Sequence, residues 1–311
     1  MGLVGLRKFL KVIAIILVFV LVIPLTYGTG FLIGSIQNKY NEEHAYTKPT
    51  EKLNIMTLNV CSWSFDGKDL ETRVKNISKV ILNNEIDSLG VQEATPYWMN
   101  ALNEKLSESY GFVGVGSNTA LDYKSSKDDG DEFTAIFYLK NKFNVVDSGY
   151  FWLSETPEKP SKGWDAECFR TATWALMKDK KTGNRFYVVN THLDHVGKEA
   201  RRNGLNLIME RIAEINPKSL PVVLMGDFNM KPSAPELKDV DARMSSARKV
   251  ALKTDNHNTF NGWGKADKDM VIDYIYISGF SSCPEYRTVT GKYADRKFVS
   301  DHYPVFARLI F

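Results

Sequence analysis

The chain has 311 residues, of which 43% are hydrophobic, 12% aromatic and 25% charged. This composition allows a substantial core and excludes an intrinsically disordered chain. The net charge is +3, and it falls to +1 when residues 1–44, with four basic and two acidic side chains, are set aside. A charge so close to neutral gives no sign of a polyanion-binding protein. The three cysteines are widely spaced without a C-x-x-C pair, so neither a disulfide framework nor a zinc site is indicated.

A long uncharged stretch lies near the N-terminus. Residues 12–36 carry no charged side chain, and Arg7, Lys8 and Lys11 precede them. As a helix this stretch would be about 37 Å long, against about 30 Å for the hydrocarbon core of a bilayer. We therefore expect a transmembrane anchor over residues 12–36, after a basic cytoplasmic segment over residues 1–11.

The charge distribution also predicts the orientation of this anchor. Because basic residues precede it, the positive-inside rule places the N-terminus in the cytoplasm and everything after residue 36 outside the cell membrane. A cleaved signal peptide is the alternative, and the protein would then be secreted. No clear A-x-A cleavage motif follows Leu25, which favours the uncleaved anchor. Residues 37–52 are expected to form a polar tether to one globular domain over residues 53–311.

Predicted strands and helices alternate along this domain. Apolar runs and two-residue alternation predict strands at 53–60, 86–93, 132–139, 144–153, 171–179, 185–194, 220–229, 270–278 and 303–311. Apolar residues at helical spacing predict helices at 69–84, 95–107 and 197–216. Such a mixed order predicts layered sheets covered by helices.

Polar side chains stand at the ends of nearly all of these predicted strands. In VVLMGDFN, Asp227 and Asn229 follow a buried run that ends at Gly226. The same pattern recurs elsewhere at Asn59, Gln92, Glu93, Glu132, Arg170, His192, Asp194, Asp273, Asp301 and His302. A single polar residue at a strand end is usually structural, because Asp and Asn favour turns. Their recurrence from strand to strand predicts one cleft, lined by these groups, at a rim of the sheets.

The same residues carry a family resemblance. The motifs LNIMTLNV, GVQE, NTHLD, GDFN, IDYI and SDHYPV occur here in the order found in the endonuclease/exonuclease/phosphatase superfamily, metal-dependent phosphoesterases that resemble DNase I. The segments GDEFTAIFY and NTHLDHVGKEAR are similar to a bacterial branch near its deadenylase-like members. The resemblance covers about residues 53–311. It implies a four-layer α/β sandwich, in which two mixed β-sheets pack face to face with helices outside.

The residue types also indicate the metal. Glu93, Asn59 and Asp301 offer hard oxygen ligands, which favour Mg²⁺ or Mn²⁺ over zinc. Mg²⁺ typically takes one or two carboxylates and completes its shell with water and substrate phosphate. The resemblance implies that Glu93 is the main ligand, with Asn59 and Asp301 close to the ion.

Hydrolysis of a phosphate ester needs an activated water, donors for the phosphoryl oxygens and help for the leaving group. Asp227 is expected to orient or deprotonate the water, and Asn229 to donate to water or phosphate. His192 and His302 are expected to donate to phosphoryl oxygens or to transfer protons. Which group is the general base stays open at this point.

The two histidines need partners at their second ring nitrogens. The resemblance implies that Glu132 pairs with His192 and that Asp273 pairs with His302. Arg170 is expected to contact the substrate phosphate, and a structural salt bridge is the alternative for it.

The sequence leaves three hypotheses of function open. The leading one is an anchored, extracytoplasmic phosphoesterase acting on a small or headgroup phosphate ester. A surface or secreted nuclease is the second, and the near-neutral charge makes nucleic acid the less favoured substrate. A non-catalytic binding module on the same fold is the third, but it has no need for the full set of polar residues. No obligate protein partner is indicated.

Overall fold

The computed structural model describes residues 52–62, 67–291, 293 and 296–311. The expected cytoplasmic segment, transmembrane anchor and nearly all of the tether, residues 1–51, lie outside these described residues. Within the described part of the chain, no helix is both long enough and apolar enough to span a bilayer.

One six-stranded sheet has the strand order β11-β12-β1-β2-β4-β3. Its strands are β1 (Lys52–Asn59), β2 (Ser88–Gln92), β3 (Tyr110–Val113), β4 (Ile136–Leu139), β11 (Ser282–Thr288) and β12 (Val305–Ile310). The pair β1 and β2 is parallel, and all other neighbours are antiparallel. The central strand β1 is buried along nearly its whole length, as expected for a strand covered on both faces.

A second six-stranded sheet has the order β5-β6-β7-β8-β10-β9. Its strands are β5 (Phe143–Trp152), β6 (Thr171–Asp179), β7 (Arg185–His192), β8 (Val222–Asp227), β9 (Ser245–Ser246) and β10 (Asp273–Ser278). Here β7 and β8 are the parallel pair, and the other neighbours are antiparallel. Both sheets are therefore mixed.

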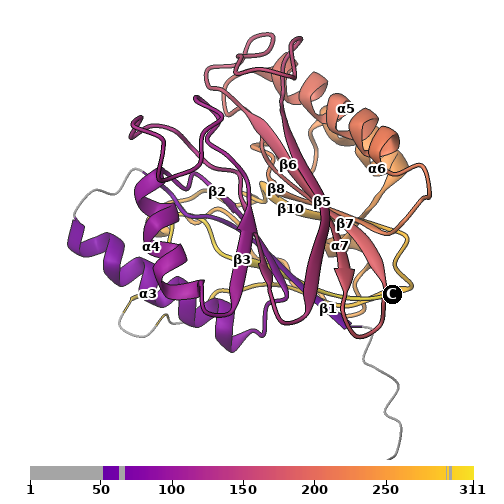
Figure 1. The fold of residues 1–311 in the computed structure, drawn as a ribbon. Coiled ribbons are helices and arrows are strands. Elements are labelled where there is room, and N and C mark those ends of the chain that lie inside the picture. The colour runs from indigo at the N-terminus through magenta and orange to yellow at the C-terminus, as the bar shows by residue number, and fades with distance from the viewer. Residues whose placement is uncertain (1–51, 63–66, 292, 294–295) are drawn as a thin grey trace, which may run out of the picture. The chain divides into compact units, whose positions relative to one another are not determined.

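Three apolar clusters hold four layers together. The outer helices are α3 (Gly67–Asn83) and α4 (Pro96–Leu106) on one side, and α5 (Lys198–Ile215) and α6 (Lys238–Arg243) on the other. Ile77 and Trp98 of the first pair share a cluster with Val91 of β2, and Ile208 of α5 shares one with Leu224 of β8. A third cluster joins the two sheets. The expected α/β sandwich of two mixed sheets with helices outside is confirmed (Figure 1).

Every strand and helix predicted from the sequence has a counterpart in the fold, with ends that differ by a few residues. The strands β3, β9 and β11 were not predicted. Each lies at the edge of a sheet, and an edge strand is paired on one side only, so its apolar pattern is weaker. The chain has a basic run from Arg243 to Lys253 whose spacing predicts one solvent-exposed helix face. Instead it is divided between the end of α6, the short helix α7 (Ala247–Val250) and the chain beyond it.

Candidate active site

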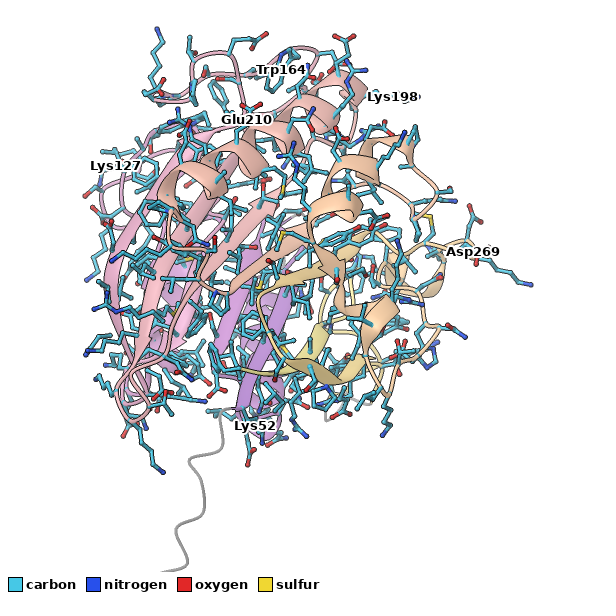
Figure 2. All side chains as sticks on the ribbon, turned by 90° about the vertical axis from the view of Figure 1, so that its right-hand side faces the viewer. Lys52, Lys127, Trp164, Lys198, Glu210 and Asp269 are labelled. Atoms are coloured by element: carbon cyan, nitrogen blue, oxygen red, sulfur yellow. The ribbon has the colours of Figure 1, made fainter. Side chains whose placement is uncertain are left out.

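The strand directions bring the predicted polar residues to one rim of the sandwich. Asn59 at the end of β1 is in register with Gln92 at the end of β2. His192 at the end of β7 is in register with Asp227 at the end of β8. Asp273, the first residue of the antiparallel strand β10, is also opposite Asp227. In Figure 2 this end of the molecule is the one with Trp164 and Lys198, and Lys52 at the start of β1 is at the other end.

Asp227 lies at the centre of this rim. Its Oδ2 is 3.6 Å from His192 Nε2 and 3.7 Å from His302 Nε2, and it accepts a hydrogen bond of 3.0 Å from Asn59 Nδ2. Since Asn59 belongs to the other sheet, this bond ties the two sheets together at the site. Burial raises the pKa of Asp227 to about 7, with His302 opposing this shift and the Asp273 carboxylate adding to it.

A glycine before Asp227 allows β7 and β8 to approach closely at this point. Gly226 has φ +144°, and a Cβ atom there would lie 1.9 Å from the carbonyl oxygen of Thr191. Only glycine fits this backbone conformation and this spacing. The glycine that ends the apolar run in the sequence is therefore required by the close approach of the two strands beside Asp227.

His302 and Asp273 form the pair that the resemblance implied. His302 Nδ1 is 2.9 Å from Asp273 Oδ2 and 3.1 Å from Oδ1. Burial disfavours the charged ring, but the carboxylates of Asp273 and Asp227 outweigh it and raise the pKa of His302 to about 10. His302 is therefore an imidazolium at neutral pH, and its Nε2–H faces Asp227.

Glu132 lies beside His192, as the resemblance implied, but the side chain within hydrogen-bond distance of His192 Nδ1 is Arg170. Glu132 Oε2 is 3.7 Å from His192 Nδ1, whereas Arg170 Nη1 is 2.9 Å from that nitrogen. The Arg170 side chain is only 6% exposed and fills the space behind the ring, with Nη1 also 3.4 Å from Glu132. Arg170 was expected at the substrate phosphate, with a structural salt bridge as the alternative; in the structure it contacts His192 and lies 3.4 Å from Glu132 and 3.5 Å from Asp194.

The contact with Arg170 determines the protonation state of His192. A guanidinium only donates hydrogen bonds, so Nδ1 must be the acceptor and Nε2 must carry the ring proton. Burial, followed by the charge of Arg170, holds the pKa of His192 well below its usual value. His192 is therefore a neutral imidazole whose N–H faces the cleft.

Asn229 also contacts Asp227. Its backbone N–H donates to Asp227 Oδ1 at 2.8 Å, and its side-chain Nδ2 donates to the carbonyl of Leu193 at 2.9 Å. The same Nδ2 is 3.1 Å from His192 Nε2. Because Nε2 carries a proton, both nitrogens present N–H groups and this contact is not a hydrogen bond; the bond to Leu193 holds the amide in its orientation. Asn229 also adopts φ +51°, a conformation that asparagine tolerates better than most residues.

Glu93 has the surroundings expected of a metal ligand. Its backbone is left-handed, with φ +58°, which costs about 1–3 kcal/mol for a residue other than glycine. Its carboxylate accepts hydrogen bonds from Asn59 Nδ2 at 2.8 Å and from the backbone N–H of Ser62 at 3.0 Å. Among the described residues, no Lys, Arg or His nitrogen lies within 4.0 Å of it. An acidic group held in this way, without a cationic partner, fits a divalent ion.

Asp301 lies close enough to add to this donor set. Burial is the main cause that raises the pKa of the Cys61 thiol to about 12, and the carboxylates of Asp301 and Glu93 both contribute. The two acidic side chains therefore both lie near one thiol. Oxygen donors from Glu93, Asn59 and Asp301 match the preference of Mg²⁺ and Mn²⁺.

Geometry alone brings together two further groups of possible ligands. Atoms of Asp227, Asp273 and His302 lie within 4.8 Å of one another, and so do atoms of Cys168, Asp194 and His195. Asp194 is not free to bind an ion, because its two oxygens accept hydrogen bonds from four backbone N–H groups. These bonds outweigh the effect of burial and hold the pKa of Asp194 at about 2.

Two amides support the site, Gln92, which the strand-end pattern included, and Asn190, which it did not. Gln92 Nε2 donates to Asn190 Oδ1 at 2.7 Å across the two sheets, and Asn190 Nδ2 donates to the carbonyls of Val91 and Ala135. Both amides are fully buried, so Gln92 is a structural tie and not a catalytic group. The signal for Asn190 was present, because it lies two residues before His192 and so on the same face of the strand.

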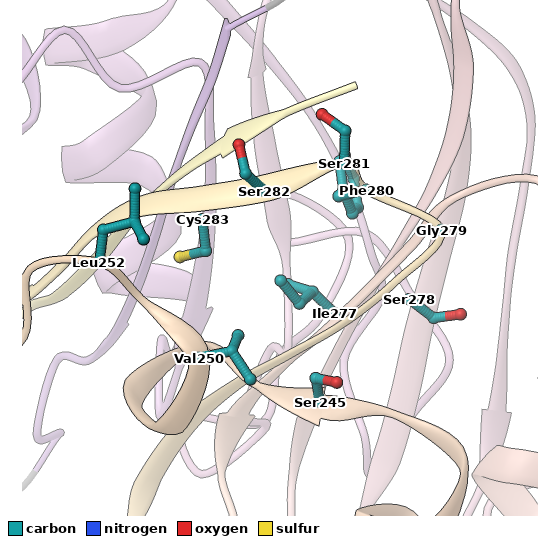
Figure 3. Close-up of a pocket in the computed structure, with 10 residues that line it drawn as sticks. All are labelled: Ser245, Val250, Leu252, Ile277, Ser278, Gly279, Phe280, Ser281, Ser282 and Cys283. Carbon is teal, nitrogen blue, oxygen red and sulfur yellow. The ribbon is translucent and has the colours of Figure 1, made fainter.

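A pocket at the other end of the sandwich contains none of the predicted site residues. It has a volume of about 340 Å³, and Figure 3 shows Val250, Leu252 and Cys283 around it, with Ser278 at the far end of β10 from Asp273. Its lining offers no charged side chain. This pocket therefore lacks the charged and imidazole side chains that the rim offers to a phosphate ester.

The sequence matches the model of one protein family over residues 56–302, the Endonuclease/Exonuclease/phosphatase family. The chain belongs to this family. The family resemblance of the strand-end motifs is thereby confirmed, and the match includes every residue placed at the rim. Members of this family are hydrolases that act on phosphate esters.

Two solved structures show how far the likeness extends. The chain is 31% identical to an endonuclease/exonuclease/phosphatase from Bacteroides vulgatus, with a TM-score of 0.75 over 83% of this chain and 98% of the other. It is 30% identical to a mannosyl-6-phosphatase from Bacteroides thetaiotaomicron, with a TM-score of 0.75 over 83% of this chain and 100% of the other.

A curated relative is more distant. Sphingomyelinase C 2 of Leptospira interrogans is 23% identical over 313 aligned positions, which cover 88% of this chain. The alignment spans only 47% of that protein, so about half of its length has no counterpart here.

Proposed function

We propose that the chain is a divalent-metal-dependent phosphoesterase that hydrolyses a small phosphate ester outside the cytoplasmic membrane. The position of Asp227 Oδ2, 3.6 Å from His192 Nε2 and 3.7 Å from His302 Nε2, carries this proposal. It places one proton acceptor beside two ring N–H donors, which is what general acid–base catalysis at a phosphate ester requires.

The reaction follows from these protonation states. The oxygen of a water forms a bond to phosphorus and gives one proton to Asp227, whose raised pKa of about 7 makes it a better base than an ordinary carboxylate. The ester P–O bond breaks, and its electron pair goes to the leaving oxygen. His302 gives that oxygen a proton, because its pKa of about 10 keeps the ring charged. The products are an alcohol and a phosphate.

The remaining groups stabilise the phosphoryl oxygens. His192 presents Nε2–H to the cleft because Arg170 occupies Nδ1, and Asn229 can offer its amide beside it. Such fixed donors act most strongly on charge that develops in the transition state. A divalent ion held by Glu93, Asn59 and Asp301 would supply positive charge to these oxygens.

A small ester is favoured over a nucleic acid. A duplex-cutting enzyme usually lines its groove with Lys and Arg that contact phosphates, whereas this chain is nearly neutral beyond residue 44. The 30% identity to a mannosyl-6-phosphatase over all of that protein supports a phosphomonoester of a small alcohol. The complete set of acid, base and ligand side chains argues against a binding module without activity.

A substrate panel tests the reaction. The full chain, purified in detergent with Mg²⁺ or Mn²⁺, would be assayed on phosphomonoesters, phosphodiesters, phospholipid headgroups and linear DNA at low and physiological salt. We expect turnover of a small ester that is lost in Asp227→Asn. Efficient DNA cleavage with a steep salt dependence and no turnover of any small ester would favour the nuclease instead.

The location is tested separately. The uncharged residues 12–36 after Arg7, Lys8 and Lys11 support export of the domain. A reporter enzyme fused after Phe311 is expected to be active only outside the cytoplasmic membrane. Reporter activity confined to the cytoplasm would contradict the proposed location and leave the proposed chemistry unaffected.

A further inference from the structure

A small polar pocket borders the candidate active site. It has a volume of about 240 Å³ and lies between the segment around Asn118 and the segment that carries Lys162, Glu167 and Phe169. Glu132 is part of its wall, and the same carboxylate is 3.4 Å from Arg170 Nη1. The pocket therefore adjoins the residues that would hold the phosphate, and a substrate could reach both.

One wall of this pocket is held rigidly. The fully buried Asp131 accepts hydrogen bonds from the backbone N–H of Asn118 and from the hydroxyls of Thr119 and Ser126. Next to it, Trp152 Nε1 donates to the carbonyl of Ser117 at 2.7 Å. A wall held by so many bonds is set before a ligand arrives, which lowers the entropic cost of binding.

The opposite wall is held by Asp194. Its Oδ2 accepts from the backbone N–H groups of Glu167 and Cys168, at 3.1 and 3.0 Å. The same carboxylate binds the turn at Val196 and Gly197 through its other oxygen. Asp194 thus joins this wall to the chain that follows His192, and both sides of the pocket are preformed relative to the catalytic residues.

The groups that face the pocket suit hydroxyl groups. Asn118 Nδ2 already donates to Asp128 at 2.8 Å, and its Oδ1 accepts from Ser117 Oγ at 3.3 Å, so that oxygen keeps one lone pair for a ligand hydroxyl. Glu132 and Glu167 add carboxylates, and Lys162 adds an ammonium that lies 5.8 Å from the Phe169 ring centroid. No carboxylate of the described residues lies within 4.0 Å of Lys162 Nζ. Donors, acceptors and one aromatic face together match a ring that carries many hydroxyls.

Charge and size narrow the choice of ligand further. The pocket has one cationic and two acidic side chains, so it disfavours a leaving group with phosphates of its own, such as a nucleic-acid strand. Its volume is below the range of about 300–1,000 Å³ that is usual for pockets of drug-sized ligands. One six-membered ring fits this space better than a nucleoside or a longer chain.

We propose that this pocket binds the leaving group of the substrate and selects a neutral, polyhydroxylated six-membered ring, a sugar or a cyclitol. Asn118, Lys162 and Glu167 are its specificity-determining residues. The inference rests on the proposed phosphoesterase function and adds the substrate class to it. The phosphate would be held by His192 and Asn229 beside Asp227, and the ring would lie beyond Glu132.

Steady-state kinetics of the full chain test the pocket with two kinds of ester. Hexose 6-phosphates and inositol 1-phosphate carry the ring, whereas glycerol 3-phosphate is too short to fill the pocket. In Lys162→Met and in Glu167→Gln, we expect KM for the ring esters to rise about tenfold, because a hydrogen bond to a charged group is lost. The kcat for these esters, and both constants for glycerol 3-phosphate, are expected to stay within about twofold. Lys159→Met is the matched control, since Lys159 belongs to the same segment but does not line the pocket.

A labelling experiment separates the pocket from the chemistry. Cys168 lines the pocket, and the other two cysteines, Cys61 and Cys283, are buried. In the inactive Asp227→Asn chain, hexose 6-phosphate or inositol 1-phosphate should slow alkylation of Cys168 by iodoacetamide, and glycerol 3-phosphate should not. Cys168→Ser identifies the labelled site.

The outcomes distinguish the two proposals. Protection of Cys168 without turnover of any ester by the native chain would support the pocket and overturn the phosphoesterase function. Turnover with no protection, or with the same KM change for ring esters and glycerol 3-phosphate, would overturn the pocket alone. A preference for a dinucleotide over every ring ester would also overturn it.

Discussion

The guanidinium of Arg170 donates to His192, with Nη1 2.9 Å from Nδ1 of the ring. A carboxylate at this position would accept a hydrogen bond from Nδ1–H and favour the charged ring. A guanidinium has the opposite effect, because it needs a lone pair on Nδ1 and repels a positive charge. The two histidines beside Asp227 therefore differ: His192 is neutral, and His302, paired with Asp273, is charged.

The first prediction concerns Arg170 as a positioning residue. In Arg170→Met, the proton of His192 is no longer confined to Nε2, and kcat should fall about 10–100-fold, as for other residues that orient a catalytic group. Arg170→Lys should restore only part of the rate, because lysine lacks the planar fork. The ¹⁵N NMR signals of the His192 ring should show Nε2–H in the native chain and a mixture of tautomers in Arg170→Met. Arg202→Met, on the exposed face of α5, is the control.

The stability of the Arg170 variants must be measured together with their activity. Loss of Arg170 also leaves Glu132 and Asp194 without their cationic neighbour, and breaking a buried ion pair is often strongly destabilising. Melting temperatures of both variants therefore accompany the kinetics. If Arg170→Met remains folded, with the His192 proton still on Nε2 and an unchanged rate, the positioning role is wrong.

The polar residues at the rim of the sandwich could be predicted from the sequence, because local pattern shows where each strand ends. The apolar run before Asp227 and the NTHLD motif around His192 each mark where a strand stops, and strand order then brings them together. The contact between Arg170 and His192 could not be predicted in this way. It depends on β6 pairing antiparallel to β7, which brings the residue before Thr171 beside the end of β7.

The supporting network was also beyond local pattern. Asn190 and Gln92 are separated by nearly a hundred positions and meet only because the two sheets pack face to face. The walls of the small pocket depend on Asp131 and Asp194, whose partners are mostly backbone N–H groups of loops. Loop geometry leaves no periodic signal, so these acidic residues are indistinguishable in sequence from surface ones.

The second prediction concerns the metal. Activity should disappear with EDTA and return when Mg²⁺ or Mn²⁺ is added in excess. Glu93→Gln removes the charge of the main expected ligand, so the metal concentration for half-maximal activity should rise at least about tenfold. Glu71→Gln, an exposed change on α3, should leave it unchanged. Full activity in metal-free buffer would contradict the proposed dependence.

The third prediction concerns pH. Asp227 accepts a proton only when ionised, so kcat/KM should fall as pH drops through its pKa, which burial raises to about 7. A bound cation favours the carboxylate, so this acid limb should lie at about pH 7 or below. His302 donates only when protonated, so activity should fall again as pH rises through about 10. A rate that increases as pH falls from about 7 to 5 would contradict these roles.

The last prediction treats His302 and Asp273 as one unit. Asp273 holds Nδ1 of the ring at 2.9 Å and is itself 1% exposed, so its effect on the reaction passes through His302. His302→Gln and Asp273→Asn should each lower kcat by about 10²–10⁴-fold, and the double variant should be little slower than His302→Gln alone.

Asp273→Asn should also move the basic limb of the pH profile to lower pH, because the carboxylate that raises the pKa of His302 is gone. A merely structural Asp273 would lower the rate without moving that limb. Asp269→Asn, an exposed change near β10 (Figure 2), controls for charge. Losses that multiply in the double variant would show that the two residues act independently.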